Sequence, residues 1–304
     1  MSSEISMQTP SGELTFRIEE GEATLTRYDG RDMELKIPQE ADGIPVTRIG
    51  DKAFFNNRHL TSIILPEGIT AIGNWAFSHC PVLTKVSLQE GECLLGKSMF
   101  DEDRKLRQIK LRSDRDKKDI RGIGSLLAAT VLTLDAPYLL TTKIENVPEW
   151  LARWDSRMMS ILGSDDMDGY TEVVLCGEED YWNNDKSPEE FVQKKRWRKV
   201  RLCFLRLLYD KELAEADKEK LRAYLKDHTK GCETEETWLF LKKERSDDMD
   251  YLELFASVGC LTEDNFHACI ADLPPDKPQM RAFLLKWQTE HLGQQDFFAA
   301  LSLD

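Results

Sequence analysis

The chain has 304 residues, of which 41% are hydrophobic and 32% are charged, so its composition is that of a globular protein rather than a disordered or fibrous one. Its 41 basic and 55 acidic residues give a formal net charge of −14, which disfavours binding to nucleic acid or to an anionic membrane unless one face is locally basic. At about 150 residues per domain, this length predicts two domains.

Several features bear on the cellular compartment. Residues 1–12 are polar, lack the apolar segment of a signal peptide, and are predicted to be disordered. The seven cysteines are odd in number and form no CxxC pair. We therefore expect reduced thiols in a cytoplasmic protein that does not contact membranes. A secreted or surface protein whose signal peptide had been removed would look the same, and this alternative stays open.

The next segments predict strands. LTFRIEE at residues 14–20 and ATLTRYDG at residues 23–30 alternate apolar and polar side chains. A longer pattern then begins at Ile49 and recurs, without an insertion, from Ile72 and from Leu95. The positions that keep their character are, in the first copy, Ile49, Gly50, Ala53, Phe54, Leu60, Ile63 and Leu65. A constant period of this length, within the range of about 20–29 residues, is typical of leucine-rich repeats.

Each copy is expected to form one turn of a coil, with a short strand whose alternate residues point inward. Phe54, Phe77 and Phe100 are predicted to stack inside the coil as an aromatic spine. The glycines are expected to permit a corner conformation that a Cβ atom would resist. Since one turn cannot bury its own apolar face, the stability of the coil depends on contacts between neighbouring turns.

The sequence also carries a family resemblance. IPVTRIGDKAF, LTSIILPEGITAIGNWAF and LTKVSL resemble the BspA-type leucine-rich repeats of bacteria, and the strands before them resemble that family's N-terminal cap. The resemblance covers residues 13–111 and implies a short leucine-rich-repeat β-solenoid with a strand cap. It implies a binding role without naming a ligand, because these repeats bind many different things. Met99 replaces the alanine of the third copy and no proline follows Leu111, which predicts that the coil ends there.

Residues 112–304 are predicted to form an all-α domain. The charged run 113–121 is interpreted as a linker or an exposed helix start, and Ser187-Pro-Glu-Glu is a full start signal for a helix that runs to about Tyr209. Further helices are predicted at residues 123–134, 146–162, 217–228, 234–244, 250–258, 262–273 and 278–291.

Two observations suggest the type of helical fold. DYLELF and QMRAFLL align with Tyr251 opposite Met280, and a spacing of roughly 30 residues suggests stacked hairpins in an α-solenoid similar to ankyrin-type arrays. The region also resembles the helical part that follows such repeats in some uncharacterised gut-bacterial proteins, through GEEDYW, KKRWRKVRLCFLRLLY and LRAYLKDHTKGCETEETW. This resemblance implies a shared fold and no known activity.

A cluster of cations surrounds Trp197, formed by Lys194, Lys195, Arg196, Arg198, Lys199 and Arg201. We interpret them as the solvated face of an amphipathic helix, neutralised by acidic neighbours such as Glu178, Glu179 and Asp180. A docking site for an acidic protein is the second interpretation, and a phosphate or nucleic-acid contact is the third. The sequence alone does not decide whether this strip is a docking site.

No residue set amounts to a catalytic or metal site. Residues 164–169 match the first half of a calcium loop, but Leu175 occupies the position that requires a bidentate glutamate, so an ordinary acidic turn is predicted. The pairs His267 with Cys269 and His79 with Cys80 lack the partners of a zinc site, and no nucleotide-binding or hydrolase motif occurs. We therefore predict no enzymatic activity, no metal and no cofactor.

The sequence thus predicts a disordered segment 1–12, a leucine-rich repeat domain 13–111 and a helical domain 112–304. The predicted function is protein–protein recognition or scaffolding through the strand face of the coil and its junction with the helices. The predicted contacts are Ile64, Lys85 and Lys110, which point outward between core positions, and Trp75, which is expected to be exposed because Lys52 and Ser98 occupy its repeat position. Two alternatives stay open: a surface or secreted binder of host or matrix proteins, and an enzyme with its site in the helical domain. Partner identity and oligomeric state are not predicted.

Overall fold

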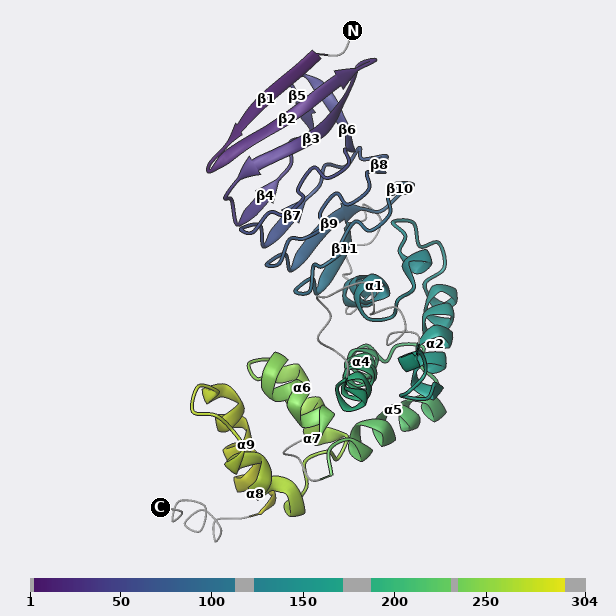
Figure 1. Ribbon diagram of the computed structural model, residues 1–304, viewed down its shortest axis with the longest axis vertical. Coiled ribbons are helices and arrows are strands. Elements are labelled where there is room, and N and C mark those ends of the chain that lie inside the picture. Colours follow the sequence, from purple (N-terminus) through teal and green to yellow (C-terminus); the bar gives the residue numbers. More distant parts are fainter. Residues whose placement is uncertain (1–2, 113–122, 172–186, 231–234, 293–304) are drawn as a thin grey trace. The chain divides into compact units, whose positions relative to one another are not determined.

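The computed structural model describes residues 3–112, 123–171, 187–230 and 235–292 (Figure 1). The chain divides into two compact units, Met1–Arg157 and Met158–Asp304, which are described separately. The charged run 113–121 and the acidic residues Glu178, Glu179 and Asp180 lie outside the described residues.

Three antiparallel strands open the first unit: β1 (Ser3–Thr9), β2 (Gly12–Glu19) and β3 (Glu22–Gly30). Strands β2 and β3 confirm the prediction for this segment. Strand β1, by contrast, occupies the segment that was expected to be disordered. Its apolar residues Ile5 and Met7 lie opposite Phe16 and Leu14 of β2, so even this polar segment alternates enough to extend the sheet.

The coil that follows has about four turns and two parallel strand ladders (Figure 1). One ladder consists of β4 (Glu34–Lys36), β7 (Ser62–Ile64), β9 (Lys85–Gln89) and β11 (Gln108–Arg112). The other joins β6 (Ile44–Ile49), β8 (Ala71–Ile72) and β10 (Leu94–Leu95), and the short strand β5 (Glu40–Ala41) pairs with β6. The predicted β-solenoid is therefore confirmed.

The aromatic spine forms as the repeat predicts. Phe54 and Phe77 stack with ring centroids 5.2 Å apart, and Phe77 and Phe100 stack at 5.4 Å. Tyr28 of β3 lies 5.7 Å from Phe54 and extends the spine into the N-terminal strands. The buried rings of three turns and of the strand cap thus form one continuous core.

The corner glycines have a different role from the one expected. A Cβ atom on Gly96 would lie 2.4 Å from the carbonyl carbon of Gly73, and one on Gly73 would lie 2.5 Å from the backbone nitrogen of Asp51. These glycines therefore permit close approach of successive turns rather than an unusual backbone angle. The left-handed conformation belongs instead to the positions two residues later, with φ of 57° at Lys52, 52° at Trp75 and 50° at Ser98.

Helices continue the first unit beyond the coil. Helix α1 (Ile123–Leu132) packs against β11, and the 3-10 helix η1 (Pro137–Leu139) follows it. In helix α2 (Val147–Gly163), the indole of Trp154 donates to the carbonyl of Leu126, and that of Trp150 donates to the carbonyl of Leu139. The last turn of the coil is thereby covered by α1 and connected to the start of α2.

The described helices of the second unit are α4 (Pro188–Leu208), α5 (Glu215–Asp227), α6 (Glu236–Glu244), α7 (Met249–Ser257), α8 (Glu263–Ala271) and α9 (Pro278–His291). The helix predicted after Ser187 is confirmed, because the side chain of Ser187 accepts the backbone N–H of Glu190 at 3.2 Å. Helix α4 packs against α5, α6 and α7, and α8 packs against α9. Among the helices described here, none is both long enough and apolar enough to cross a membrane.

Candidate binding surfaces

The first surface is the strand face, which we define as the outward side chains of β4, β7, β9 and β11. They are Glu34, Lys36, Ser62, Ile64, Lys85, Ser87, Gln108 and Lys110. Between them the inward residues Leu35, Ile63, Val86 and Ile109 are buried, so the alternation predicted from the repeat is observed. The small side chain of Ser87 is also buried, so the polar surface is interrupted at this position.

Strand pairing arranges the strand face in two rows. One row runs Lys36–Ile64–Ser87–Lys110, and the other runs Glu34–Ser62–Lys85–Gln108. Three of the predicted contacts, Ile64, Lys85 and Lys110, therefore lie on one surface. Strand β4 adds a fourth strand that the prediction of this surface did not include, which widens the ladder to about 14 Å at about 4.8 Å per strand.

Trp75, the fourth predicted contact, lies elsewhere. It is 41% exposed, as predicted, but it belongs to a loop on the side of the coil that follows β8. We define the loop face as the outward side chains of the three equivalent loops 51–59, 74–82 and 97–105. Backbone hydrogen bonds join these loops, with Lys52 N–H donating to Asn74 and Trp75 N–H donating to Lys97, both at 3.0 Å.

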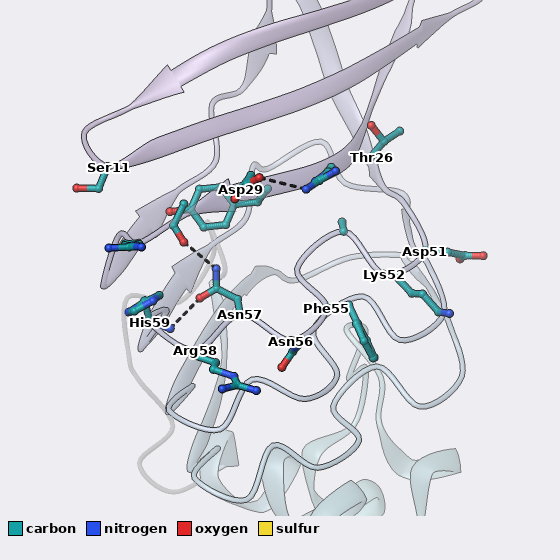
Figure 2. Close-up of a pocket in the computed structure, with 15 residues that line it drawn as sticks. Ser11, Thr26, Asp29, Asp51, Lys52, Phe55, Asn56, Asn57, Arg58 and His59 are labelled. Carbon is teal, nitrogen blue, oxygen red and sulfur yellow. Dashed lines mark hydrogen bonds and ion pairs between the residues drawn. The ribbon is translucent and has the colours of Figure 1, made fainter.

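The loop face borders a polar groove of about 740 Å³ between the end of β3 and the first loop (Figure 2). Figure 2 shows Asn57 inside this groove, where its side chain donates to the carbonyl of Gly30 at 3.1 Å and accepts the N–H of His59. Arg27 pairs with Asp29 at 3.1 Å on the strand side. The groove is therefore lined mainly by charged and polar groups, with Phe55 and Tyr28 among its lining residues.

A cavity of about 650 Å³ lies where the coil meets the helices of the first unit. It is lined by the third loop, from Leu95 to Arg104, and by residues of α1 and η1 such as Val131 and Pro137. It therefore adjoins the loop face, whereas the junction was expected to enlarge the strand face.

Buried Asp103 adjoins this cavity at the repeat position of Asn57 and Cys80. One carboxylate oxygen accepts the N–H of Cys80 at 2.7 Å, and the other is buried without a hydrogen-bond partner among the described residues. Burial raises the pKa of Asp103 to about 8, against the opposing effect of the bond from Cys80. Burial likewise raises the pKa of the Cys80 thiol to about 12, which is expected for a thiol packed in the core rather than for a reactive one.

The basic strip of α4 is neutralised from within the second unit. Lys199 is 3% exposed and donates to Asp166 and to the carbonyl of Ser164, both at 2.7 Å. Arg196 donates to Asp166 at 2.8 Å, and Arg201 and Trp197 both donate to Glu244. The predicted neutralisation by acidic neighbours is thus observed, but through Asp166 and Glu244, and the strip is only partly a solvated face.

The contacts of Asp166 also show that the carboxylates of the acidic turn at residues 164–169 bind side chains and backbone of this chain. Asp166 is engaged by two cations, and Asp168 accepts the backbone N–H of Asp165 at 3.1 Å. Burial alone would raise the pKa of Asp166, but hydrogen bonds from Lys199 and Arg196 outweigh burial and lower it. Leu175 lies outside the described residues. Across the described ranges, no three His, Cys, Asp or Glu side chains gather as metal ligands would.

Comparison with known families bears on the coil. Residues 34–125 match the BspA type leucine rich repeat region, a family described with six copies of the repeat. Residues 34–125 are a BspA-type leucine-rich repeat region. The match begins at β4 and extends into α1, so the BspA-type region contains the whole strand face and loop face.

Solved structures of bacterial leucine-rich repeat proteins align with about a third of the chain. A leucine rich cell surface protein from Faecalibacterium prausnitzii A2-165 is 26% identical with a TM-score of 0.30, and the alignment covers 36% of this chain and 32% of that one. The leucine rich repeat protein of T. pallidum is 23% identical with a TM-score of 0.26, and the alignment covers 34% of this chain and 45% of that one. A leucine-rich repeat protein from Bacteroides capillosus ATCC 29799 is 25% identical with a TM-score of 0.28, and the alignment covers 35% of this chain and 98% of that one. The chain thus covers less than half the length of the first two proteins. No curated protein matches it.

Sequence reasoning missed two parts of these surfaces. Strand β4 was detectable from the sequence. Leu35 and Ile37 have the same spacing as Ile63 and Leu65 of the next turn, and each precedes its counterpart by the same number of residues. The groove beside Asn57 carried no such signal, because it depends on how the end of β3 approaches the first loop of the BspA-type region.

Proposed function

We propose that the chain is a non-enzymatic protein-recognition module that binds its partner through the strand face of the BspA-type region. Leucine-rich repeats of this family are binding modules in general, and no specific partner follows from the family. The observation that carries the proposal is the register of the four parallel strands. It places Lys36, Ile64 and Lys110 in one row and Lys85 in the next, on a rigid backbone.

Rigidity is what makes this face suitable for recognition. The outward side chains alternate with buried neighbours of their own strand, so little backbone ordering remains to be done on binding. Half-buried Ile64 supplies apolar area, and Lys36 and Lys85 supply charge beside it. An apolar centre with a polar surround is the usual composition of a protein interface.

The helical unit is included in the proposal as a scaffold. Helices α7 and α9 carry the DYLELF and QMRAFLL segments, whose aligned residues Tyr251 and Met280 are both buried. The packing of α8 on α9 supports the interpretation as stacked hairpins of ankyrin-like type.

The chemistry of the described thiols supports a non-enzymatic, cytoplasmic assignment. Burial raises the pKa of Cys93 to about 11 and also raises that of Cys203, whereas a nucleophilic cysteine needs a lowered pKa. The described cysteines are free, as expected in a reducing compartment: Cys80, Cys93, Cys203, Cys260 and Cys269. Recovery of the protein from culture medium rather than from the cell lysate would favour the surface or secreted alternative.

The test compares charge changes on two sides of the coil. Wild-type protein and the variants Ile64→Glu, Lys85→Glu and Lys110→Glu are used to capture partners from lysate of the source cells, and binding of the purified partner is then measured. The strand-face variants should each weaken binding about tenfold or more, which corresponds to about 1.4 kcal/mol.

Arg48→Glu is the matched control, because Arg48 is exposed on β6, in the other ladder of the coil. It should leave the affinity unchanged. Partner binding that survives all three strand-face variants would contradict the proposal, provided that circular dichroism shows the variants to be folded.

A further inference from the structure

The loop face carries a feature that the strand face lacks, an exposed aromatic pair beside cations. Phe55 is 43% exposed, close to the value for Trp75. The ammonium of Lys52 lies 5.5 Å from the ring centroid of Trp75 and 5.7 Å from that of Phe55. His79 also lies against Phe55, with ring centroids 5.1 Å apart.

Neither the backbone nor the core accounts for a tryptophan at position 75. Its φ of 52° is in the left-handed region, which bulky residues rarely adopt and which costs about 1–3 kcal/mol. Lys52 and Ser98 adopt the same conformation in the neighbouring turns, so the loop does not require an aromatic side chain. The ring is also too exposed to serve the core. The remaining explanation for Trp75 is that its ring contacts a binding partner at the surface.

Further cations lie beside this aromatic pair, in the groove. Arg31 and Arg58 both line the groove and are exposed, and neither forms an ion pair within the described residues. Figure 2 shows Phe55 and Arg58 on the same loop, with Lys52 beyond Phe55. In a chain with a net charge of −14, such a patch attracts anionic groups that most of the surface repels.

The third loop lacks the exposed aromatic rings of the first two. Asp101 and Glu102 stand at the repeat positions that Phe55 and Asn56 occupy in the first loop, and Ser98 stands at the position of Trp75. In this loop the carboxylates lie beside the cations Lys97, Arg104 and Lys105, and Arg104 pairs with Glu102 at 2.8 Å. A ligand that uses both charge and aromatic contact therefore finds them together only in the first two turns, which fits a short segment.

We propose that the first two turns of the loop face, with the groove beside them, bind an acidic peptide segment that carries an apolar side chain. The carboxylates contact Arg31 and Arg58, and the apolar side chain lies on Phe55 and Trp75. Nucleic acid is disfavoured, because Asp29 and Asp51 line the same groove and would repel a continuous phosphate backbone. This surface is distinct from the strand face, so the inference goes beyond the proposed function.

The experiment measures fluorescence anisotropy of labelled probes with the full chain. The probes are a short peptide of alternating Glu and Leu, the same peptide with Gln in place of Glu, and an oligothymidylate of equal length. The Glu–Leu peptide should bind, its affinity should fall with added salt, and the Gln–Leu peptide should bind about tenfold more weakly.

Variants then locate the site. Arg31→Glu and Arg58→Glu should each weaken binding of the Glu–Leu peptide about tenfold, and Trp75→Ser, which introduces the residue of the equivalent third-turn position, about fivefold. Lys85→Glu on the strand face and Arg48→Glu on β6 should leave it unchanged. Thermal unfolding establishes that each variant is folded.

Three results would overturn the inference: no binding of the Glu–Leu peptide, binding that Arg58→Glu does not weaken, or tighter binding of oligothymidylate. Each is distinguishable from failure of the strand-face proposal, because that proposal is tested with the native partner and with Lys85→Glu.

Discussion

Lys85 stands on the strand face of the coil between two uncharged neighbours, whereas Lys199 of α4 is buried against Asp166. Lys199 belongs to a sequence stretch that contains several cations, whereas Lys85 is the only Lys or Arg among residues 80–90. In the strands of the coil, successive side chains point to opposite faces, so a charged residue at an outward position faces solvent. In α4, contacts on several sides with α5, α6 and α7 leave less of the helix surface facing solvent.

The comparison shows that the density of charge along a sequence does not locate a binding surface. The strip around Trp197 has the higher density of cations, and Arg196, Lys199 and Arg201 of this strip form ion pairs with Asp166 or Glu244. The coil has fewer cations along its sequence, but the strand register places Lys36, Lys85 and Lys110 on one outward face. Three measurements test this difference between the coil and α4.

The largest effect is expected from the core of the coil. Phe77→Ala removes the middle ring of the stacked spine, where Phe77 has no solvent exposure, and should destabilise the first unit by about 3–5 kcal/mol. Phe55→Ala is the matched control, because Phe55 is an exposed phenylalanine beside Phe54 of the spine, and it should cost less than about 0.5 kcal/mol. Urea denaturation measures both. Equal losses would show that the spine does not dominate the stability of the coil.

The next effect tests whether the α4 cations are internal. Asp166→Ala leaves the ammonium of Lys199 buried without a carboxylate, which should cost about 3 kcal/mol and speed hydrogen exchange in α4. Because the pKa of Asp166 is lowered in the folded state, this contribution is present at neutral pH and is lost as the pH falls below about 4.

Asp168→Ala provides the control for that measurement. Asp168 lies in the same turn and accepts a backbone N–H of Asp165, so its removal should cost about 1 kcal/mol or less. A loss as large as that of Asp166→Ala would mean that the turn itself, rather than the ion pair, stabilises α4.

The smallest effect concerns a carboxyl group that the coil buries. The pKa of Asp103 is raised to about 8, so ionisation of the unfolded chain lowers stability as the pH rises from about 4 to about 8. Asp103→Asn removes this loss and should stabilise the first unit by about 1–3 kcal/mol at pH 8, with little change at pH 4. Thermal unfolding at both pH values tests this, and an equal effect at both would refute it.

The features that depend on sequence period were predictable. The regular recurrence of Phe54 at Phe77 and Phe100 predicted the coil, the spine and the inward side chains, and start signals such as Ser187-Pro-Glu-Glu predicted helix positions closely. Helix start signals depend only on neighbouring residues. The features of the coil recur in every turn, so each copy of the repeat predicts the same side-chain positions.

Features that depend on contacts between unlike segments were not predictable. The partner of Lys199 is Asp166, which lies in an acidic turn that precedes α4 and whose sequence resembles only the first half of a calcium loop. Strand β1 was missed because its few apolar residues are meaningful only opposite Phe16 and Leu14. Trp75 was correctly expected to be exposed, but the repeat does not say on which side of a turn a given position lies.

The glycine corner has a consequence for the length of the array. Gly73 and Gly96 bring successive backbones together so closely that any side chain at these sites would push two layers apart. The glycine corner therefore fixes the spacing between successive turns, so further turns can be added there at the same spacing. The residue types in the wider loops can vary, because those loops are not packed so closely. Duplicating one complete copy from glycine to glycine would lengthen the scaffold without altering its pitch, whereas an insertion at the corner itself would split the stack into two shorter pieces.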